Sequence, residues 1–290
     1  MTTTPASPSS TADASDAAHA AEAFLRNFHD NGPGRQSVGV EGAPLADGRT
    51  SYQVLAAEVA GARRVLDLGC ADGALLEVLG AAGAEELAGI DLSGQELALA
   101  RARPALRGAD LRQGRAQELP FADGSFDAVV SHMALMLMHG VDRVAAEAAR
   151  VLVPGGRFAV AVSGGAVEGQ ATRLFLELAR PYFRAAPPER TMPQLGSGRL
   201  LTRETLDELL GPAGFAPVSW HTVVLEMGGT PEEVWTATTR SFYNMVELDK
   251  GETASLRAEF FAAVPALLDA DGRAPAGSRL NIATTRLSAE

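Results

Sequence analysis

The chain has 290 residues, with 46% hydrophobic and 21% charged residues and a formal net charge of −11. This length and composition are typical of a globular protein with one large or two small domains and a substantial core. The negative charge argues against a nucleic-acid-binding surface, which needs clustered lysine and arginine, and it favours a small-molecule substrate.

The single cysteine, Cys70, excludes an intramolecular disulfide and a cysteine metal cluster. No apolar run approaches the roughly 18 residues that a membrane span needs, and residues 1–20 lack the basic and apolar parts of a secretion signal. The five histidines show no metal-ligand spacing. We therefore expect a cytoplasmic protein, a monomer or homodimer, without a metal, a membrane partner or a nucleic-acid partner.

The N-terminal fifth of the chain predicts a tail followed by two helices. Residues 1–16 are rich in Ser, Thr, Ala and Pro, which is typical of a disordered tail. Phe24, Leu25 and Phe28 recur at helical spacing and predict an amphipathic helix over residues 17–28. A second helix is predicted over residues 52–59.

The most informative stretch is a strand, a glycine turn and a helix. Residues 64–68 form a short apolar run that predicts a buried parallel strand, and a helix is predicted to start at Ala74. Between them, the small residues Gly69, Ala71 and Gly73 allow backbone N–H groups to approach a ligand. Asp67 would repel a pyrophosphate, so the turn favours a cofactor with a positive sulfonium and a free amino group.

Cys70 lies inside this turn, and two interpretations are open. A cysteine at a helix N-terminus can have a lowered pKa and act as a nucleophile. Its place within the turn favours a packing role instead.

A second strand is predicted over residues 87–93, and it carries Asp91, 18 residues beyond Gly73. An acid at this distance in a doubly wound fold lies at the tip of the second strand, where its oxygens accept the ribose hydroxyls, with Leu92 beside it. The alternative is that Asp91 or Ser93 caps the helix predicted over residues 94–103.

The fourth predicted strand, residues 128–131, ends where a doubly wound sheet places its ligand crevice. Ser131, His132 and Met133 should therefore face the cofactor. His132 is the candidate catalytic residue, because histidine can accept a proton from a nucleophile near neutral pH. The alternative is a packed, positioning histidine. The apolar run of residues 133–138 predicts a short helix that ends near His139, a weaker candidate.

The remainder of the chain alternates between predicted helices and strands. The third strand is expected before Asp110, and a Pro/Gly-rich loop over residues 187–198. Helices are predicted over residues 141–151, 170–185, 202–210 and 232–247, and strands over residues 157–162, 216–227 and 278–286, the last one antiparallel.

Five ordered signatures within residues 65–162 resemble the class I S-adenosylmethionine-dependent methyltransferases of the small-molecule type. They are Asp67-Leu-Gly69-Cys-Ala71-Asp-Gly73, the acid Asp91, Arg115-Ala-Gln-Glu-Leu-Pro-Phe121, Asp123-Gly-Ser-Phe-Asp127 and Arg150-Val-Leu-Val-Pro-Gly-Gly-Arg157. In the first, Ala71 replaces the middle glycine of the family.

The resemblance implies a Rossmann-like α/β fold with a seven-stranded sheet in the order 3-2-1-4-5-7-6. Residues 17–60 would form an N-terminal cap, 61–164 the S-adenosylmethionine-binding core, 165–200 a lid insertion, and 201–290 the rest of the core with a helical insertion for the substrate pocket. By this resemblance Ser51 and Tyr52 contact the cofactor, with helix capping and core packing as alternatives. In the family an acid at position 115 binds the adenine amino group, but Arg115 cannot accept a hydrogen bond. The backbone N–H of Ala116 and the side chain of Gln117 are the expected adenine contacts, because both are available whatever residue is at 115.

The implied function is transfer of a methyl group from S-adenosyl-L-methionine to oxygen, nitrogen or carbon of a small molecule, in secondary metabolism. Two alternatives keep the cofactor but not the transfer, namely a cyclisation or similar rearrangement, and a protein that only senses the cofactor.

Overall fold

The structure is a computed structural model that describes residues 11–196, 200 and 202–289. The strands are β1 (Arg64–Leu68), β2 (Glu86–Asp91), β3 (Asp110–Gln113), β4 (Phe126–His132), β5 (Leu152–Ala166), β6 (Ser219–Glu226) and β7 (Gly277–Arg286). The α-helices are α1 (Thr11–Asp30), α2 (Arg35–Glu41), α3 (Ser51–Glu58), α4 (Ala74–Ala81), α5 (Gly94–Ala102), α6 (Val141–Val151), α7 (Ala171–Ala185), α8 (Arg203–Leu210), α9 (Pro231–Ser241) and α10 (Lys250–Ala263). Short 3₁₀ helices include η2 (Leu135–Leu137) and η4 (Tyr243–Glu247).

The strands form one seven-stranded sheet in the order β3-β2-β1-β4-β5-β7-β6, which confirms the predicted topology. β1 pairs in parallel with β2 on one side and with β4 on the other, and β7 runs antiparallel to both β5 and β6. The strand order reverses direction at β1 and β4, so a ligand crevice is expected at the carboxyl ends of these two strands.

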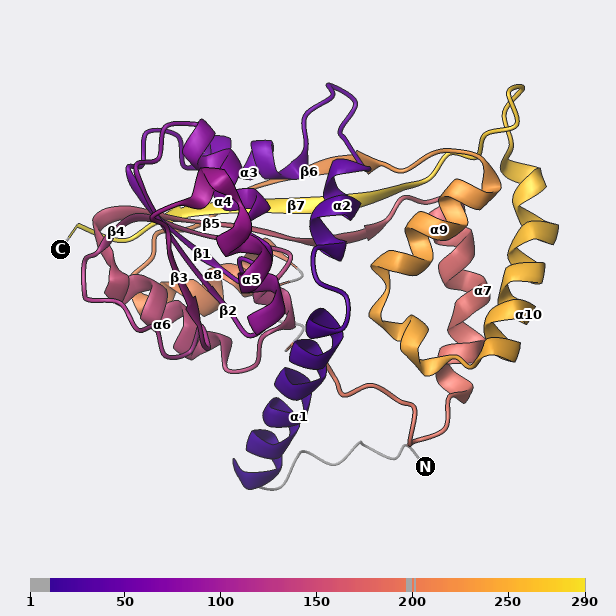
Figure 1. The fold of residues 1–290 in the computed structure, drawn as a ribbon, viewed down its shortest axis with the longest axis horizontal. Helices are drawn as coiled ribbons and strands as arrows, with labels where there is room; N and C mark the ends of the chain where they lie inside the picture. Colours follow the sequence, from indigo (N-terminus) through magenta and orange to yellow (C-terminus); the bar gives the residue numbers. More distant parts are fainter. Residues whose placement is uncertain (1–10, 197–199, 201, 290) are drawn as a thin grey trace.

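Helices cover both faces of the sheet (Figure 1). On one face α3, α4 and α5 bury Leu55, Leu76 and Leu97 against the strands, and on the other α6 and α8 bury Val144 and Leu206. Because both faces are covered, the central strands β1 and β4 are mostly apolar, as is usual for parallel sheets, with Asp67 and His132 near their carboxyl ends.

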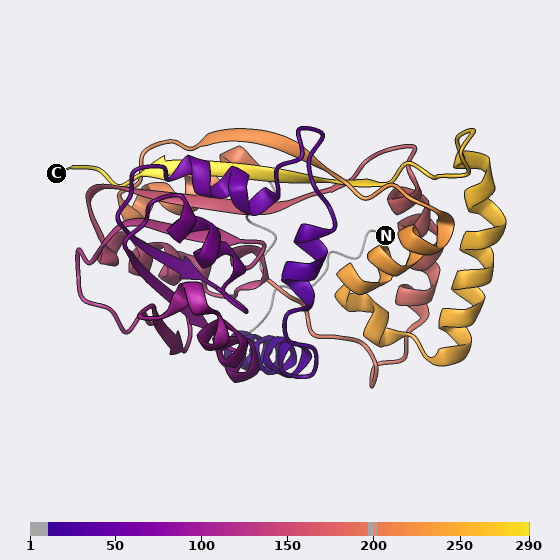
Figure 2. The ribbon, with the colours of Figure 1, turned by 45° about the horizontal axis from the view of Figure 1, so that its top comes forward.

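Helices α7, α9 and α10 form a separate helical unit beyond the end of the sheet. Its centre is aromatic, with the Phe175 and Trp235 rings 5.8 Å apart and the Trp235 and Phe260 rings 5.6 Å apart. Long strands β5, β6 and β7 lead from the sheet to this unit, and α2 lies between the two (Figures 1 and 2). The two insertions predicted in residues 165–200 and 201–290 therefore pack against each other.

Two predictions at the start of the chain and at β3 need correction. Helix α1 begins at Thr11, inside the stretch predicted as a disordered tail, because residues 11–22 are rich in the good helix former alanine; residues 1–10 lie outside the described residues. The third strand is Asp110–Gln113 itself, not a segment before it. This edge strand is polar, so it lacks the hydrophobic pattern that marks the central strands.

The helix predicted over residues 133–138 is only the 3₁₀ turn η2. Met133 has φ 56°, a left-handed conformation that cannot continue a helix. Residues 232–247 also form two elements, α9 and η4, in place of one helix.

Helices α2 and α10 were not predicted. α2 is short and contains Gly39, so its sequence has little helical signal. α10 has a readable start, since the Asp249 side chain accepts hydrogen bonds from the backbone N–H groups of Gly251 and Glu252.

Candidate functional site

The glycine turn between β1 and α4 brings the backbone close to neighbouring elements. Gly69 and Gly73 both have φ 78°, and a side chain on either would collide with Ala134 or Leu106. Ala71 has φ 44°, where the methyl group of a non-glycine residue is strained. Its N–H donates to Asp91 Oδ2 at 2.9 Å, which helps to hold this conformation.

Asp67 is buried at the end of β1, with 2% of its surface exposed, and its Oδ1 has no hydrogen-bond partner. Burial, and next the charge of Asp91, raise the pKa of Asp67 well above its usual value. A buried carboxylate oxygen without a partner is costly unless a ligand supplies a donor or a cation. The site therefore fits a cationic, amino-bearing ligand.

Asp91, at the end of β2, is held by two backbone hydrogen bonds. Its Oδ2 accepts from Ala71 and its Oδ1 accepts from the N–H of Ser93 at 2.8 Å, so each oxygen keeps a second lone pair for a ligand. Burial raises the pKa of Asp91, and these hydrogen bonds oppose the shift. Ser93 is the cap of α5, accepting from Glu96 N at 3.1 Å, so the capping role does not fall to Asp91.

A cavity of about 490 Å³ lies in front of these two acids. Its wall combines the carboxyl ends of β1, β2 and β4 with α1, the η4 turn and the start of β7. Most of the predicted site residues line it, namely Tyr52, Asp67, Gly69, Cys70, Ala71, Asp91, Leu92, Ala116, Gln117, His132 and Met133.

Gly73 and Ser131 do not line the cavity. Gly73 is the N-cap of α4, packed close to Ala100 and Leu106. Ser131 is fully buried behind the wall, where its hydroxyl donates to the Leu68 carbonyl at 2.9 Å and accepts from Leu135 N. Their contribution to the site is to fix the turn and the end of β4.

His132 lines the cavity, and its Nε2 lies 2.9 Å from the Ser51 hydroxyl. The Tyr52 ring packs edge-on against the imidazole at 4.7 Å. Burial lowers the pKa of His132 to about 4. The ring is therefore neutral near pH 7, a weak base whose Nε2 already has a partner, and the geometry favours a positioning role.

Cys70 is buried, and burial raises the pKa of its thiol well above the usual value. A thiol with a raised pKa is a poor nucleophile. The Cys70 side chain packs directly against Gly89 of β2, so closely that a side chain on Gly89 would collide with the sulfur. The structure thus favours the packing interpretation of Cys70.

Next to β3, the Arg115 guanidinium forms an ion pair with Glu22 of α1 at 2.7 Å. The Gln117 amide donates to the His139 carbonyl at 2.7 Å, which leaves its side-chain oxygen available to a ligand. The predicted adenine contacts and the first helix are thereby brought to the same end of the cavity.

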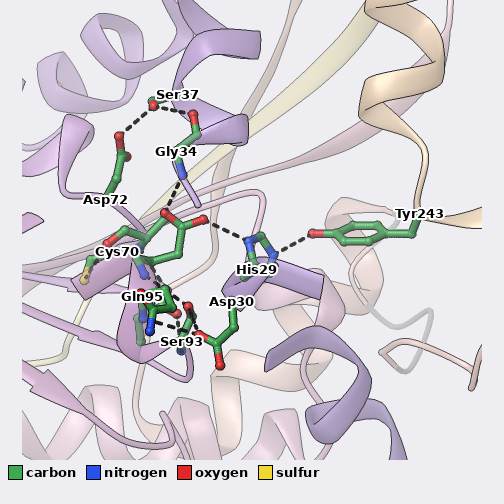
Figure 3. A network of polar contacts seen from close by, with 12 residues as sticks. His29, Asp30, Gly34, Ser37, Cys70, Asp72, Ser93, Gln95 and Tyr243 are labelled. Carbon is green, nitrogen blue, oxygen red and sulfur yellow. Dashed lines mark hydrogen bonds and ion pairs between the residues drawn. The ribbon is translucent and has the colours of Figure 1, made fainter. Parts of the chain in front are cut away.

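The sequence did not identify the α1 and η4 residues that complete the wall. His29 Nδ1 lies 3.2 Å from the buried Glu96 carboxylate, and His29 Nε2 lies 3.1 Å from the Tyr243 hydroxyl. Figure 3 shows this histidine between Tyr243 and the core. The Glu96 carboxylate also accepts a hydrogen bond from Gly34 N. Because Glu96 is fully buried and 67 residues from His29, only the folded structure reveals the pair.

Within the described ranges, no three metal-binding side chains lie together as a metal site. Among the helices that the structure describes, none combines the length and apolarity needed to cross a bilayer.

Residues 66–160 match the family model of a methyltransferase domain. The chain is 36% identical over 148 residues to malonyl-[acyl-carrier protein] O-methyltransferase of Methylococcus capsulatus, covering 46% of this chain and 54% of that protein. It is 37% identical over 105 residues to fatty-acid O-methyltransferase of Mycolicibacterium smegmatis, covering 33% and 35%. The chain thus spans about half or less of the length of these curated relatives.

Among solved structures, the fold is similar to phosphoethanolamine N-methyltransferase 2 of Haemonchus contortus, in complex with phosphomonomethylethanolamine and S-adenosylhomocysteine. The TM-score is 0.54 at 16% identity, over 92% of this chain and 60% of the other. At this identity the likeness concerns the fold. Together with the family match, it confirms the resemblance to class I S-adenosylmethionine-dependent methyltransferases that the sequence predicts.

Proposed function

We propose that this chain, which carries a class I methyltransferase domain, transfers a methyl group from S-adenosyl-L-methionine to a small-molecule acceptor. The observation that carries the proposal is the unpartnered oxygen of Asp67, buried beside Asp91 at the carboxyl ends of β1 and β2. Two acids at this edge suit a cationic nucleoside without phosphates and disfavour a dinucleotide.

In this proposal, different residues of the cavity bind different parts of the cofactor. Asp67 accepts from the amino group of the cofactor, and Asp91 accepts from the ribose hydroxyls, each a charge-assisted contact of about 1.5–3 kcal/mol. Ala116 and Gln117 contact the adenine. S-adenosylmethionine, when bound, supplies an electrophilic methyl group.

Catalysis in this proposal rests mainly on position. Holding the acceptor in line with the methyl group and excluding water can lower the barrier by about 7–11 kcal/mol. His132, beside Met133 at the end of β4, stays our candidate for contact with the reacting groups. Its hydrogen bond to Ser51 supports orientation of the acceptor by a neutral imidazole.

A cavity of about 490 Å³, whose wall is largely apolar and includes α1 and η4, supports a small-molecule acceptor. The two relatives described above are named as O-methyltransferases, which supports an oxygen acceptor, with nitrogen and carbon as alternatives. A setting in secondary metabolism stays a prediction from the sequence.

The test is incubation of the protein with methyl-labelled S-adenosylmethionine and a panel of acids, alcohols, phenols and amines. Label that moves into an acceptor supports the proposal. If the cofactor binds and no label moves, the chain performs a rearrangement or senses the cofactor, and methyl transfer is ruled out for that panel. If NAD competes for the same cavity, the assignment of Asp67 is wrong.

A further inference from the structure

The part of the cavity away from the two acids differs from the cofactor end in chemistry. It is formed by β7, the start of α7, the C-terminal end of α9 and the segment around Met192, and most of its side chains are apolar. They include Met136, Met192, Leu195, Met227 and Phe242. An apolar surface of this kind suits the hydrocarbon part of an acceptor.

Arg279 of β7 is the exception in this apolar region. It lines the cavity, it is half-buried, and its Nη2 donates to the Ala166 carbonyl at 3.2 Å. Across the described part of the chain, no carboxylate lies within ion-pair distance of its guanidinium, whereas Arg115 in the same wall is paired with Glu22. A half-buried guanidinium without an acid gains from an anionic ligand.

The strand order separates this arginine from the acids of the cofactor end. Asp91 lies on β2 and Arg279 on β7, four strand intervals apart in the sheet. At about 4.8 Å per interval the two strands are roughly 19 Å apart. The acids that line the cavity are Glu22, Asp67 and Asp91, on α1, β1 and β2. The acids of the wall therefore lie at the cofactor end, where Arg26 and Arg115 also line it, and Arg279 lies apart from them.

Thr172 provides a second, independent polar group. It lies in the first turn of α7, lines the cavity, is 1% exposed, and its hydroxyl has no hydrogen-bond partner. The strand pairing brings it to the same region as Arg279, because Ala166 pairs with Ser278 and the N–H of Ala171 donates to the Pro275 carbonyl at 2.8 Å. A buried hydroxyl without a partner is rare in folded proteins, and a ligand oxygen satisfies it.

We propose that Arg279 and Thr172 form a carboxylate-binding subsite, so that the acceptor of this enzyme is an apolar carboxylic acid. The guanidinium and the hydroxyl bind the carboxylate, and the methionine and leucine side chains contact the hydrocarbon part. That the bound acid is the methyl acceptor rests on the proposed function. Binding of the carboxylate at this subsite can be tested without methyl transfer. Arg279 is then a specificity-determining residue, since it selects the acid over an uncharged analogue.

The experiment measures binding to the full chain saturated with S-adenosylhomocysteine, which permits no transfer. The probes are octanoate and octanamide, which share the same hydrocarbon and differ in charge. We expect octanoate to bind at least tenfold more tightly. Arg279→Met should remove this preference, and Thr172→Val should weaken octanoate alone by about two- to tenfold.

Arg286→Met is the matched control, because Arg286 lies on the same strand at an exposed position, where its guanidinium donates to the Gly155 carbonyl. It should leave the preference for octanoate intact. Equal affinity for both probes in the natural protein, or an unchanged preference in Arg279→Met, overturns the subsite. Affinity for S-adenosylhomocysteine, measured first on each variant, confirms that the variant is folded and tests the proposed function separately.

Discussion

His29 on α1 and Tyr243 on η4 are 214 residues apart in the sequence, and their Nε2 and hydroxyl atoms lie 3.1 Å apart across the wall of the cavity. The other ring nitrogen faces Glu96, whose carboxylate can only accept when ionised, so Nδ1 donates to it. In that tautomer, Nε2 carries no proton and accepts from the Tyr243 hydroxyl. This chain of contacts joins the helical unit to the core beside the cofactor end.

Tyr243→Phe should therefore loosen the closure of the cavity without creating a void. A hydrogen bond of this kind contributes about 0.5–1.5 kcal/mol, so affinity for S-adenosylhomocysteine should fall roughly two- to tenfold. The matched control is Tyr182→Phe, since the Tyr182 hydroxyl bonds to Glu259 within the helical unit. Equal affinities in both variants would show that the His29 contact does not hold the cavity closed.

Asp67→Asn should stabilise the cofactor-free protein and weaken cofactor binding. The raised pKa of Asp67 means that the unfolded acid loses its proton first, so stability is lost as the pH rises from about 4 through the folded pKa. Removing the charge should raise the melting temperature at pH 7.5 by about 2 °C or more. The affinity for S-adenosylhomocysteine should fall at least tenfold.

The opposite sign is expected at Asp127, which serves as the control. It accepts from the backbone and guanidinium of Arg64, and this hydrogen bonding lowers its pKa. Asp127→Asn should lower the melting temperature at pH 7.5. A lower melting temperature in Asp67→Asn as well would contradict the assignment of Asp67 as a buried, unpartnered acid.

His132 should make the folded state sensitive to acid. Its pKa of about 4 lies below the ordinary value of 6.5, so the unfolded chain binds the proton first and stability falls as the pH drops from 6.5 toward 4. Urea unfolding at pH 7 and pH 5 should show a smaller loss in His132→Asn than in the natural protein. The same loss of stability in both proteins would show that His132 does not cause the sensitivity to acid.

Turnover gives a second readout on the same residue. His132→Asn should lower the rate of methyl transfer, while affinity for S-adenosylhomocysteine stays within about twofold, because in the proposed function the ring contacts the reacting groups and not the rest of the cofactor. Full activity in the variant would leave His132 as a packing residue.

Much of the core could be predicted from the sequence because local signals and topology agree there. The run of residues 64–68, the turn from Gly69 to Gly73 and the position of Asp91 each follow from short-range patterns, and the structure places both acids at one edge of the cavity. Polar strand β3 and the short helix α2 lack such patterns, so their bounds were missed or wrong.

The rest of the cavity depends on contacts between residues far apart in the chain. Nothing near Tyr243 indicates that it meets His29, and nothing near Arg279 indicates that it lacks an acid. Ser131 illustrates the same limit in reverse, since its place after a central strand predicted exposure to the ligand while its hydroxyl is used by Leu68 and Leu135.

The most direct test of the central claim is a calorimetric titration of the purified protein with S-adenosylhomocysteine, compared with Asp91→Asn and with Asp110→Asn. Asp110 lies exposed on β3, outside the cavity wall, and pairs with Arg112. We predict saturable one-site binding in the natural protein and in Asp110→Asn, and at least tenfold weaker binding in Asp91→Asn. No detectable binding to the natural protein, or equal affinity in all three, would contradict the account.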